Sequence, residues 1–215
     1  MPYQREIPQV HTAVADAVMR AGEPGETATT AALLDLAQHG LLTLRPCTRV
    51  VTSIFGATER DSYEFVVDST RWKEFDPLDQ ELVSLLFTTM KHSAAMSLLD
   101  LRVLLRSRES TYARGIAAWR AAVVARAVAD GLLEPTGRSR TAAGEELHGR
   151  CEALRDYIRD FGRLEDDRLM SLELWGPYLV WAALFGLADE TVATMRPKAM
   201  GYCDDLMLAA ETIAR

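Results

Sequence analysis

The stretch that decides the fold lies between residues 31 and 67. It opens with Ala31-Ala-Leu-Leu-Asp-Leu-Ala-Gln-His-Gly-Leu-Leu42, in which apolar residues recur at helical spacing. The pattern then changes to Arg49-Val-Val-Thr-Ser-Ile-Phe55 and Tyr63-Glu-Phe-Val-Val67, which are rich in the β-branched and aromatic residues that strands favour. Between them, Gly56-Ala-Thr-Glu-Arg-Asp61 predicts a turn. The stretch therefore predicts a helix followed by a β-hairpin.

A further helix is predicted ahead of this stretch. Valines at positions 10, 14 and 18 form an apolar stripe that ends at the turn of residues 21–25. Thr27 or Thr29 is the expected N-cap of the second helix, and Gly40 is placed to end it in the left-handed conformation. Helix, helix and hairpin over residues 9–68 predict a winged-helix-like unit, to which we assign residues 1–75.

The remaining residues, 76–215, predict a helical region. Asp76 suits an N-cap and Pro77 the first position of a third helix. A long helix rich in arginine and alanine should run to Gly131, and Thr141 should cap the next one. Further helical segments are expected over residues 164–175, 177–187 and 189–215, with a split at Gly176-Pro177.

The predicted fold class is mostly α with small β-hairpins, in which the winged-helix-like unit of residues 1–75 precedes a helical bundle over 76–215. Ala127-Val-Ala-Asp-Gly-Leu-Leu133 repeats the pattern of Leu36-Ala-Gln-His-Gly-Leu-Leu42. This echo leaves room for a second winged-helix-like unit in the later region.

Composition narrows the class of protein. The net charge is −7, and residues 1–75, 76–131 and 132–215 carry −3, +1 and −5. An acidic chain is repelled by phosphate backbones, which counts against nucleic acid as a partner. Cys47, Cys151 and Cys203 are far apart and odd in number, which fits a reducing compartment better than a disulfide framework or a zinc site. The N-terminus does not have the pattern of a signal peptide.

The longest apolar run, residues 178–187, is too short to span a bilayer, which needs about 20 residues, and predicts a buried core helix. The four tryptophans lie among apolar residues and are expected to pack in the core or at an interface. The histidines at positions 11, 39, 92 and 148 are isolated, so surface or boundary positions are expected for them rather than metal ligation.

Catalytic and metal-binding motifs are missing from the sequence. It contains no nucleophile elbow, phosphate-binding loop or dinucleotide fingerprint, so we expect no enzyme activity, no catalytic residues and no cofactor. Glu165-Asp-Asp-Arg168 could hold a divalent cation, but a solvated helix N-terminus is the simpler interpretation. No metal is expected.

One segregated basic feature remains, a series of arginines with Glu109 as the acid within it. Its candidate contact residues for an anionic surface are Arg102, Arg106, Arg114, Arg120 and Arg126, with Arg108 between them. An anionic membrane surface or nucleic-acid phosphates are the functional interpretations. An exposed helix face that pairs with acidic neighbours is the plain alternative.

Four segments carry a resemblance to a known family: Tyr3-Gln-Arg-Glu-Ile-Pro8, residues 31–42, Arg140-Thr-Ala-Ala-Gly-Glu-Glu-Leu147 and residues 174–187. Together they resemble the cytoplasmic C-terminal region of bacterial predicted membrane proteins, domain of unknown function 2207. The resemblance implies an exported β-rich domain and a membrane segment ahead of this region. It also implies a hydrophobic hairpin, whose place is taken here by Glu134-Pro-Thr-Gly-Arg-Ser139. The chain would then be a piece of a membrane-anchored parent or a naturally short relative.

Two functions are compatible with these observations. The first is a cytoplasmic protein-interaction module of a bacterial membrane protein, which the resemblance, the acidic charge and the missing catalytic motifs favour. The alternative is a winged-helix regulator that binds DNA. The second helix carries no arginine or lysine between Thr29 and His39, although a groove-reading helix needs such side chains. The identity of a protein partner and the oligomeric state do not follow from the sequence.

Overall fold

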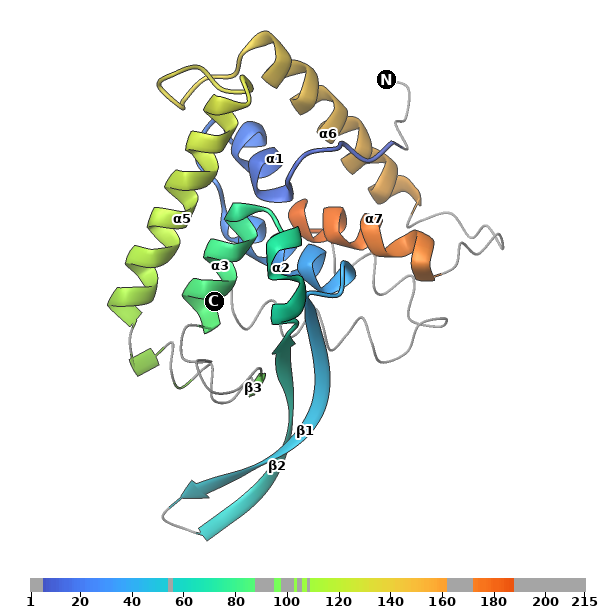
Figure 1. Cartoon of the computed structure of the whole chain (residues 1–215). Helices are drawn as coiled ribbons and strands as arrows, with labels where there is room; N and C mark the ends of the chain where they lie inside the picture. The colour runs from blue at the N-terminus through green and yellow to red at the C-terminus, as the bar shows by residue number, and fades with distance from the viewer. Residues whose placement is uncertain are drawn as a thin grey trace.

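The computed structural model describes residues 6–53, 56–87, 95–97, 103, 106–107, 109–161 and 172–187. In these residues the chain is mostly helical with one small antiparallel sheet, which confirms the predicted fold class. The helices form a body from which a long β-hairpin projects (Figure 1). The predicted helices over residues 189–215 and the acidic run at 165–168 lie outside the described residues.

The order of elements in the first half agrees with the prediction of helix, helix and hairpin. The elements and their bounds are α1 (Thr12–Met19), α2 (Glu26–Gln38), β1 (Leu42–Ser53), β2 (Gly56–Val67), the 3-10 helix η1 (Ser69–Glu74), α3 (Pro77–Phe87), β3 (Ala95–Ser97), α5 (Glu109–Ala129), α6 (Ala142–Phe161) and α7 (Leu172–Leu184).

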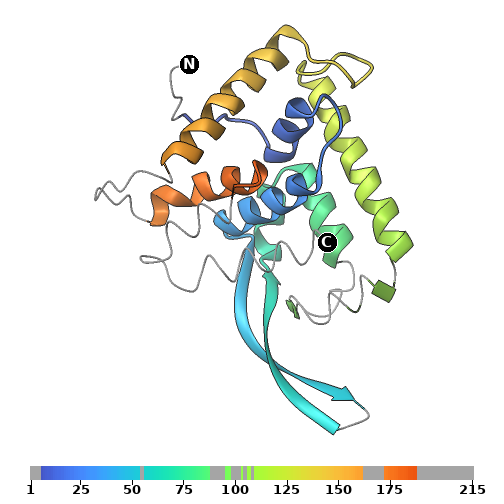
Figure 2. The same ribbon diagram turned by 180° about the vertical axis from the view of Figure 1, so that it is seen from behind.

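The first two helices form the centre of the body. Residues 12–18 of α1 are all buried, and α1 lies between α5 and α6, which diverge from the loop of residues 130–141 (Figure 2). α2 is buried along residues 28–34 and again at Leu36 and Ala37, because α1, α7 and β1 pack against it. One continuous hydrophobic core thus contains residues from both predicted units, and the boundary predicted at residue 75 is not a break in packing.

The echo between residues 36–42 and 127–133 corresponds to two helix ends of the same geometry. Each helix closes with a left-handed glycine, followed by a leucine whose N–H bonds a carbonyl five residues back, as in a Schellman motif. The glycines are Gly40 (φ 75°) and Gly131 (φ 70°), and the leucine bonds are Leu41 to Leu36 at 3.0 Å and Leu132 to Ala127 at 2.9 Å.

A hairpin follows each of these two helix ends and closes in the same way. The carbonyl of Leu41 accepts the N–H of Asp68 at 2.8 Å, and the carbonyl of Leu132 accepts the N–H of Thr141 at 3.1 Å. The second hairpin is reduced to a single bridge between Leu133 and Arg140. The chain therefore uses one helix–hairpin connection twice, with a long hairpin in the first case and a minimal one in the second.

The end of α1 has the same geometry but no glycine in the left-handed position. The N–H of Gly22 bonds the carbonyl of Ala17 at 2.7 Å, and Ala21 takes the left-handed conformation with φ 51°. A side chain with a Cβ is strained there, so Ala21→Gly should raise the free energy of unfolding by about 0.5–1 kcal/mol, measured by urea denaturation. The reciprocal change, Gly131→Ala, meets no atom within 4 Å and should lower it by about 1 kcal/mol. Equal effects of the same sign in both variants would contradict this account.

Three of the predicted helix caps can be compared with the structure. Asp76 caps α3, since its Oδ1 accepts the N–H of Leu78 at 2.9 Å, and Thr141 caps α6, since its Oγ1 accepts the N–H of Gly144 at 3.1 Å. These two predictions are confirmed.

The expected cap of α2 at Thr27 or Thr29 is wrong, because that helix begins after Gly25. The carboxylate of Asp16, which is 2% exposed, accepts the N–H of Gly25 at 2.6 Å and sets where the loop ends. Thr29 is buried and belongs to the interior of the helix. The hydrogen bond between Asp16 of α1 and Gly25 therefore determines where α2 begins.

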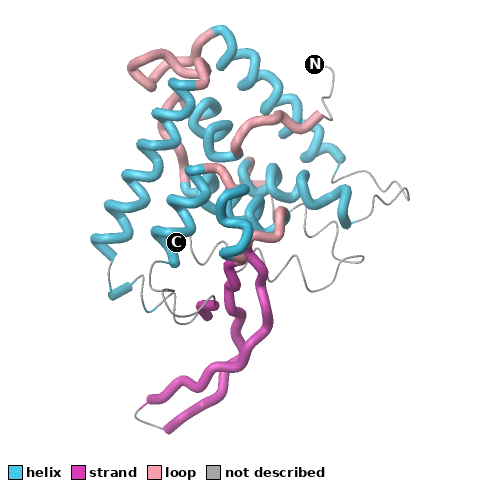
Figure 3. The backbone as a smooth tube through the Cα atoms, in the orientation of Figure 1, coloured by secondary structure: helices cyan, strands magenta, loops and turns pink. Residues whose placement is uncertain are grey.

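The predicted turn at residues 56–61 is also wrong. β1 pairs with β2 from Leu42↔Val67 out to Ser53↔Gly56, so residues 56–61 belong to a strand and only residues 54 and 55 connect the two (Figure 3). Glycine, threonine and acidic residues suggested a turn. At the far end of this hairpin the described side chains are exposed, so polar residues are tolerated within a strand.

The helical split expected at Gly176-Pro177 is wrong, because α7 continues through Pro177 from Leu172 to Leu184. Packing against α2 holds this helix, and the Cβ that Gly176 lacks would lie 2.2 Å from the side chain of Gln38. Residues 179–184 are buried, which confirms the core helix predicted for the apolar run.

The small hairpin of residues 133–140 closes against the end of α1. The guanidinium of Arg140 donates to the carbonyl of Val18 at 2.6 Å, which also accepts the N–H of Ala21 at 3.3 Å, and to the carbonyl of Met19 at 2.7 Å. Carbonyls in the last turn of a helix lack the usual partner four residues further on. Gly22 and Gly137 meet backbone to backbone, with the Cβ position of Gly22 only 1.7 Å from the carbonyl oxygen of Gly137. The reduced hairpin thus serves as a cap for α1.

Candidate functional site

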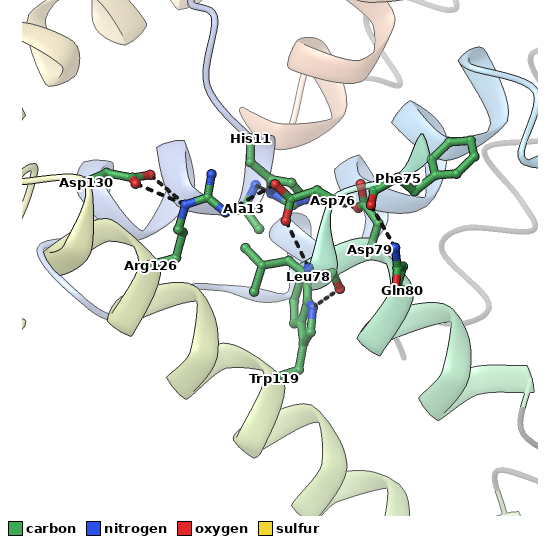
Figure 4. Close-up of polar contacts among 10 residues, drawn as sticks. All are labelled: His11, Ala13, Phe75, Asp76, Leu78, Asp79, Gln80, Trp119, Arg126 and Asp130. Carbon is green, nitrogen blue, oxygen red and sulfur yellow. Dashed lines mark hydrogen bonds and ion pairs between the residues drawn. The ribbon is translucent and has the colours of Figure 1, made fainter. Parts of the chain in front are cut away.

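Polar side chains gather at the start of α3, where the start of α1 and the second half of α5 converge on that helix (Figure 4). We call this set the polar junction. Its members come from three parts of the chain and are His11, Asp76, Asp79, Gln80, Trp119, Arg126 and Asp130.

The first turn of α3 is tied down by its own side chains. Besides the cap by Asp76, the side-chain amide of Gln80 donates to the carbonyls of Trp72 at 3.0 Å and Phe75 at 2.9 Å. These bonds hold the chain that leads from η1 into the helix. Asp79, in the same turn, is left to face α1.

His11 connects the start of α1 to α3 and uses both of its ring nitrogens. Nδ1 accepts the N–H of Ala13 at 3.2 Å and caps α1, while Nε2 lies 3.0 Å from Oδ1 of Asp79. The tautomer with its proton on Nε2 satisfies both contacts. The two side chains are 8% and 9% exposed, so this is a buried pair. His11 as a whole residue is half-buried, which agrees with the boundary position expected for it, although its side chain is buried; His39 is exposed as predicted.

Opposing effects act on the pKa of His11. Burial lowers it, but the hydrogen bond and charge of Asp79, with smaller effects from Asp76 and Asp35, raise it further than burial lowers it. The pKa of His11 therefore lies above its ordinary value. Asp35 on α2 differs, because burial raises the pKa of its carboxyl.

α5 supplies the remaining members of the polar junction. The guanidinium of Arg126 bonds Asp130 in the next turn at 2.9 Å and reaches Asp76 at 3.2 Å. Trp119 is fully buried and its indole N–H donates to the carbonyl of Leu78 at 2.8 Å. Arginine and tryptophan thus fix the distance between α5 and the start of α3.

The polar junction holds α1, α3 and α5 together. In the neutral ring of His11, Nδ1 accepts the N–H of Ala13 and Nε2 faces Asp79, so neither nitrogen lies open to a nucleophile. The other buried reactive group, Cys151, lies on α6, and burial raises the pKa of its thiol to about 12. Its thiolate is therefore scarce at neutral pH.

The structure separates the predicted arginine series instead of placing it on one face. Arg102 and Arg108 lie outside the described residues, and Arg106 is exposed just before α5. Arg114 is exposed on the side of α5 opposite its buried residues, while Arg120 and Arg126 flank the buried face on either side. Arg126 is already paired with Asp76 and Asp130. Contact of this series with an anionic surface stays a prediction.

The β1–β2 hairpin is the second candidate site. Its base is fixed to the body by Leu42 and Phe65, which are 2% and 3% exposed, by the contact of Phe65 with Phe87, and by β3, which pairs with residues 64–66. Beyond this base the hairpin leaves the body (Figure 1). Val50 in its outer half is 63% exposed. No sequence pattern singled out this arm, since its length depends on the pairing register.

The described residues contain no group of three or more histidine, cysteine or acidic residues arranged to hold a metal ion. Among the helices in the described part of the chain, none combines the length and the apolar character needed to cross a bilayer.

Comparison with known proteins identifies a family for the chain. The family described as "Predicted membrane protein (DUF2207) C-terminal domain" matches residues 1–140 and 115–195 of the chain. The two matched segments overlap over residues 115–140, which include the small hairpin and the place where the family's hydrophobic hairpin was expected to be missing. The description names no reaction. No curated protein and no solved structure matches the chain.

Proposed function

Because the chain belongs to the family of predicted membrane protein (DUF2207) C-terminal domains, we propose that it is the cytoplasmic protein-interaction module of a bacterial membrane protein. The observation that carries this proposal is the β1–β2 hairpin, whose two strands have twelve residues each and which projects from the helical body (Figure 3). An isolated two-stranded hairpin is marginally stable in water, so a partner that covers it would supply stabilisation that the body does not.

The faces of the hairpin, rather than its β1 edge, suit recognition. Described side chains on both faces of β1 are exposed, as at Arg45, Thr48 and Val50. Pro46 lies within β1 and has no N–H to offer an added strand, which disfavours edge-to-edge pairing there. A partner would therefore bind through side-chain contacts with the exposed faces.

A protein fits this arm better than a nucleic acid does. The hairpin carries three arginines and three acidic residues, so its net charge is zero. Phosphate-directed binding needs an excess of positive charge. The alternative of a winged-helix regulator would place α2 in the major groove. However, α1, α7 and β1 cover most of the circumference of α2. We therefore expect no binding of duplex DNA through α2.

The arm can be removed without disturbing the core. Replacing residues 46–63 with Asn-Gly would close β1 and β2 on the pair Arg45↔Glu64, which has the same parity in the register as the natural last pair, Ser53↔Gly56. Leu42 and Phe65 stay in place, so the free energy of unfolding should change by less than about 1 kcal/mol. Circular dichroism and urea denaturation check this step.

Crosslinking in the membrane-anchored parent then tests the function. A photo-crosslinking amino acid at Val50 should form an adduct with a protein, whereas the same group at exposed Ala121 on α5 should not. Added domain with the intact hairpin should compete the adduct away, and the domain with the shortened hairpin should not.

Three results would overturn the proposal. They are equal adducts at both positions, competition by the shortened domain as strong as by the intact one, and no adduct at Val50. An adduct with DNA at Val50 would support the regulator instead.

A further inference from the structure

The ring of His11 makes two hydrogen bonds, and each requires a different protonation state of the nitrogen involved. As the N-cap of α1, Nδ1 must present a lone pair to the N–H of Ala13. As the partner of Asp79, Nε2 must carry a proton. The neutral ring meets both demands. The doubly protonated ring meets the second only, because an imidazolium has no acceptor.

The charges around His11 favour the doubly protonated ring. The groups that act on it are Asp79 and Asp76 from α3 and Asp35 from α2. Arg126 of α5 and Asp130, directly after that helix, lie behind Asp76, and Arg126 is paired with both acids. His39 faces Asp35 from the end of α2, with Nδ1 3.5 Å from a carboxylate oxygen. Charged groups of α6 and α7 are not among those that act on His11.

We propose that His11 is a proton-operated switch at the start of α1, in which the neutral ring caps the helix and uptake of a proton at Nδ1 releases the cap while the ring stays bound to Asp79. The bond that breaks is the one from the Ala13 N–H to Nδ1, and the contact that strengthens is the ion pair between Nε2 and Asp79. Ile7 and Val10, just before His11, pack against the core. The switch therefore acts where the N-terminal segment joins the helical body.

Local and global stability should respond to pH in opposite directions. The cap of α1 is present above the pKa of His11 and lost below it. The pKa of His11 is raised in the folded protein, so its global contribution is fully present below the unfolded value and lost as pH rises through the folded value. Acidification through this window should therefore increase the free energy of unfolding while the first turn of α1 loosens.

Amide exchange and nitrogen chemical shifts of the same protein distinguish the two effects. The ring nitrogen shifts, followed across a pH titration that extends above the ordinary titration range of histidine, should report titration of His11. The protection factor of the Ala13 amide, corrected for intrinsic exchange, should fall by about five- to tenfold on the acidic side of that titration. Asp79→Asn removes the charge that favours the proton, so the midpoint should move to lower pH.

Two variants serve as controls. His11→Asn keeps an acceptor for the Ala13 N–H and has no proton to gain, so its Ala13 protection should not change with pH. His39→Asn removes an exposed histidine at the end of α2 and should leave the Ala13 titration in place. The switch is overturned by constant Ala13 protection across the titration of His11, or by a His11 ring that does not titrate in this range. Retention of the pH dependence in His11→Asn would also overturn it.

Discussion

Gly22→Ala should lower the free energy of unfolding by about 3 kcal/mol or more. The residue has φ 91°, a conformation in which a side chain with a Cβ is strained by about 1–2 kcal/mol. The added Cβ would also lie 1.7 Å from the carbonyl oxygen of Gly137. That oxygen belongs to the backbone, so the whole hairpin of residues 133–140 would have to move, together with the Arg140 bonds to α1.

Urea denaturation followed by circular dichroism measures this loss, and Gly149→Ala is the matched control. Gly149 lies within α6, and a Cβ there meets no atom within 4 Å. Alanine is the better helix former, so this variant should gain about 0.5–1 kcal/mol. A loss smaller than about 1 kcal/mol for Gly22→Ala would contradict the backbone contact between the two glycines.

Trp119→Ala should cost about 3–5 kcal/mol, because it empties the largest fully buried side chain of the described residues. The ring lies between α5 and α3, and its N–H bonds the carbonyl of Leu78 at 2.8 Å. The change therefore removes both packing and the polar contact that fixes the distance between these helices.

Trp119→Phe separates the two contributions to that loss. Phenylalanine keeps most of the apolar surface but has no donor for Leu78, so a loss of about 1–2 kcal/mol is expected. Both variants should be compared by urea denaturation followed by circular dichroism, since fluorescence would change with the tryptophan itself. Equal losses in the two variants would show that the hydrogen bond, not the packed ring, carries the effect.

Structural features that depend on a few neighbouring residues were predicted correctly from the sequence. Asp76 and Thr141 cap their helices, Gly40 ends α2 in the left-handed conformation, and α5 ends at Ala129, two residues before Gly131. Within the apolar run of residues 178–187, residues 179–184 are buried in α7, which ends at Leu184. Each of these features depends on backbone groups within one turn of the residue concerned, so the local sequence contains the information.

Errors arose where a distant contact overrode a local preference. Pro177 should interrupt a helix, but packing against α2 keeps α7 continuous. Residues 56–61 have the composition of a turn, yet the register with β1 makes them a strand. The start of α2 is set by a bond from Asp16, not by the threonines inside that helix.

The candidate sites show the same division. The sequence indicated that catalytic motifs were missing and that a hairpin followed the second helix, but it did not predict how far the hairpin would project. It treated His11 as an isolated surface or boundary residue, although a histidine directly before a helical stripe can serve as an N-cap. Its partner Asp79 lies 68 residues away in the chain, and no local pattern could indicate that pairing.

The stretch of residues 31–67 therefore determined a helix, its glycine end and a following pair of strands, because propensity, periodicity and capping act between near neighbours. Tertiary packing settled the length of the arm, the burial of α2 and the assembly of the polar junction. Those features depend on the free energy of contacts such as Trp119 with Leu78 and Arg140 with Val18, which are 41 and 122 residues apart. Such contacts form only when the chain folds, and therefore they could not be predicted from the local sequence.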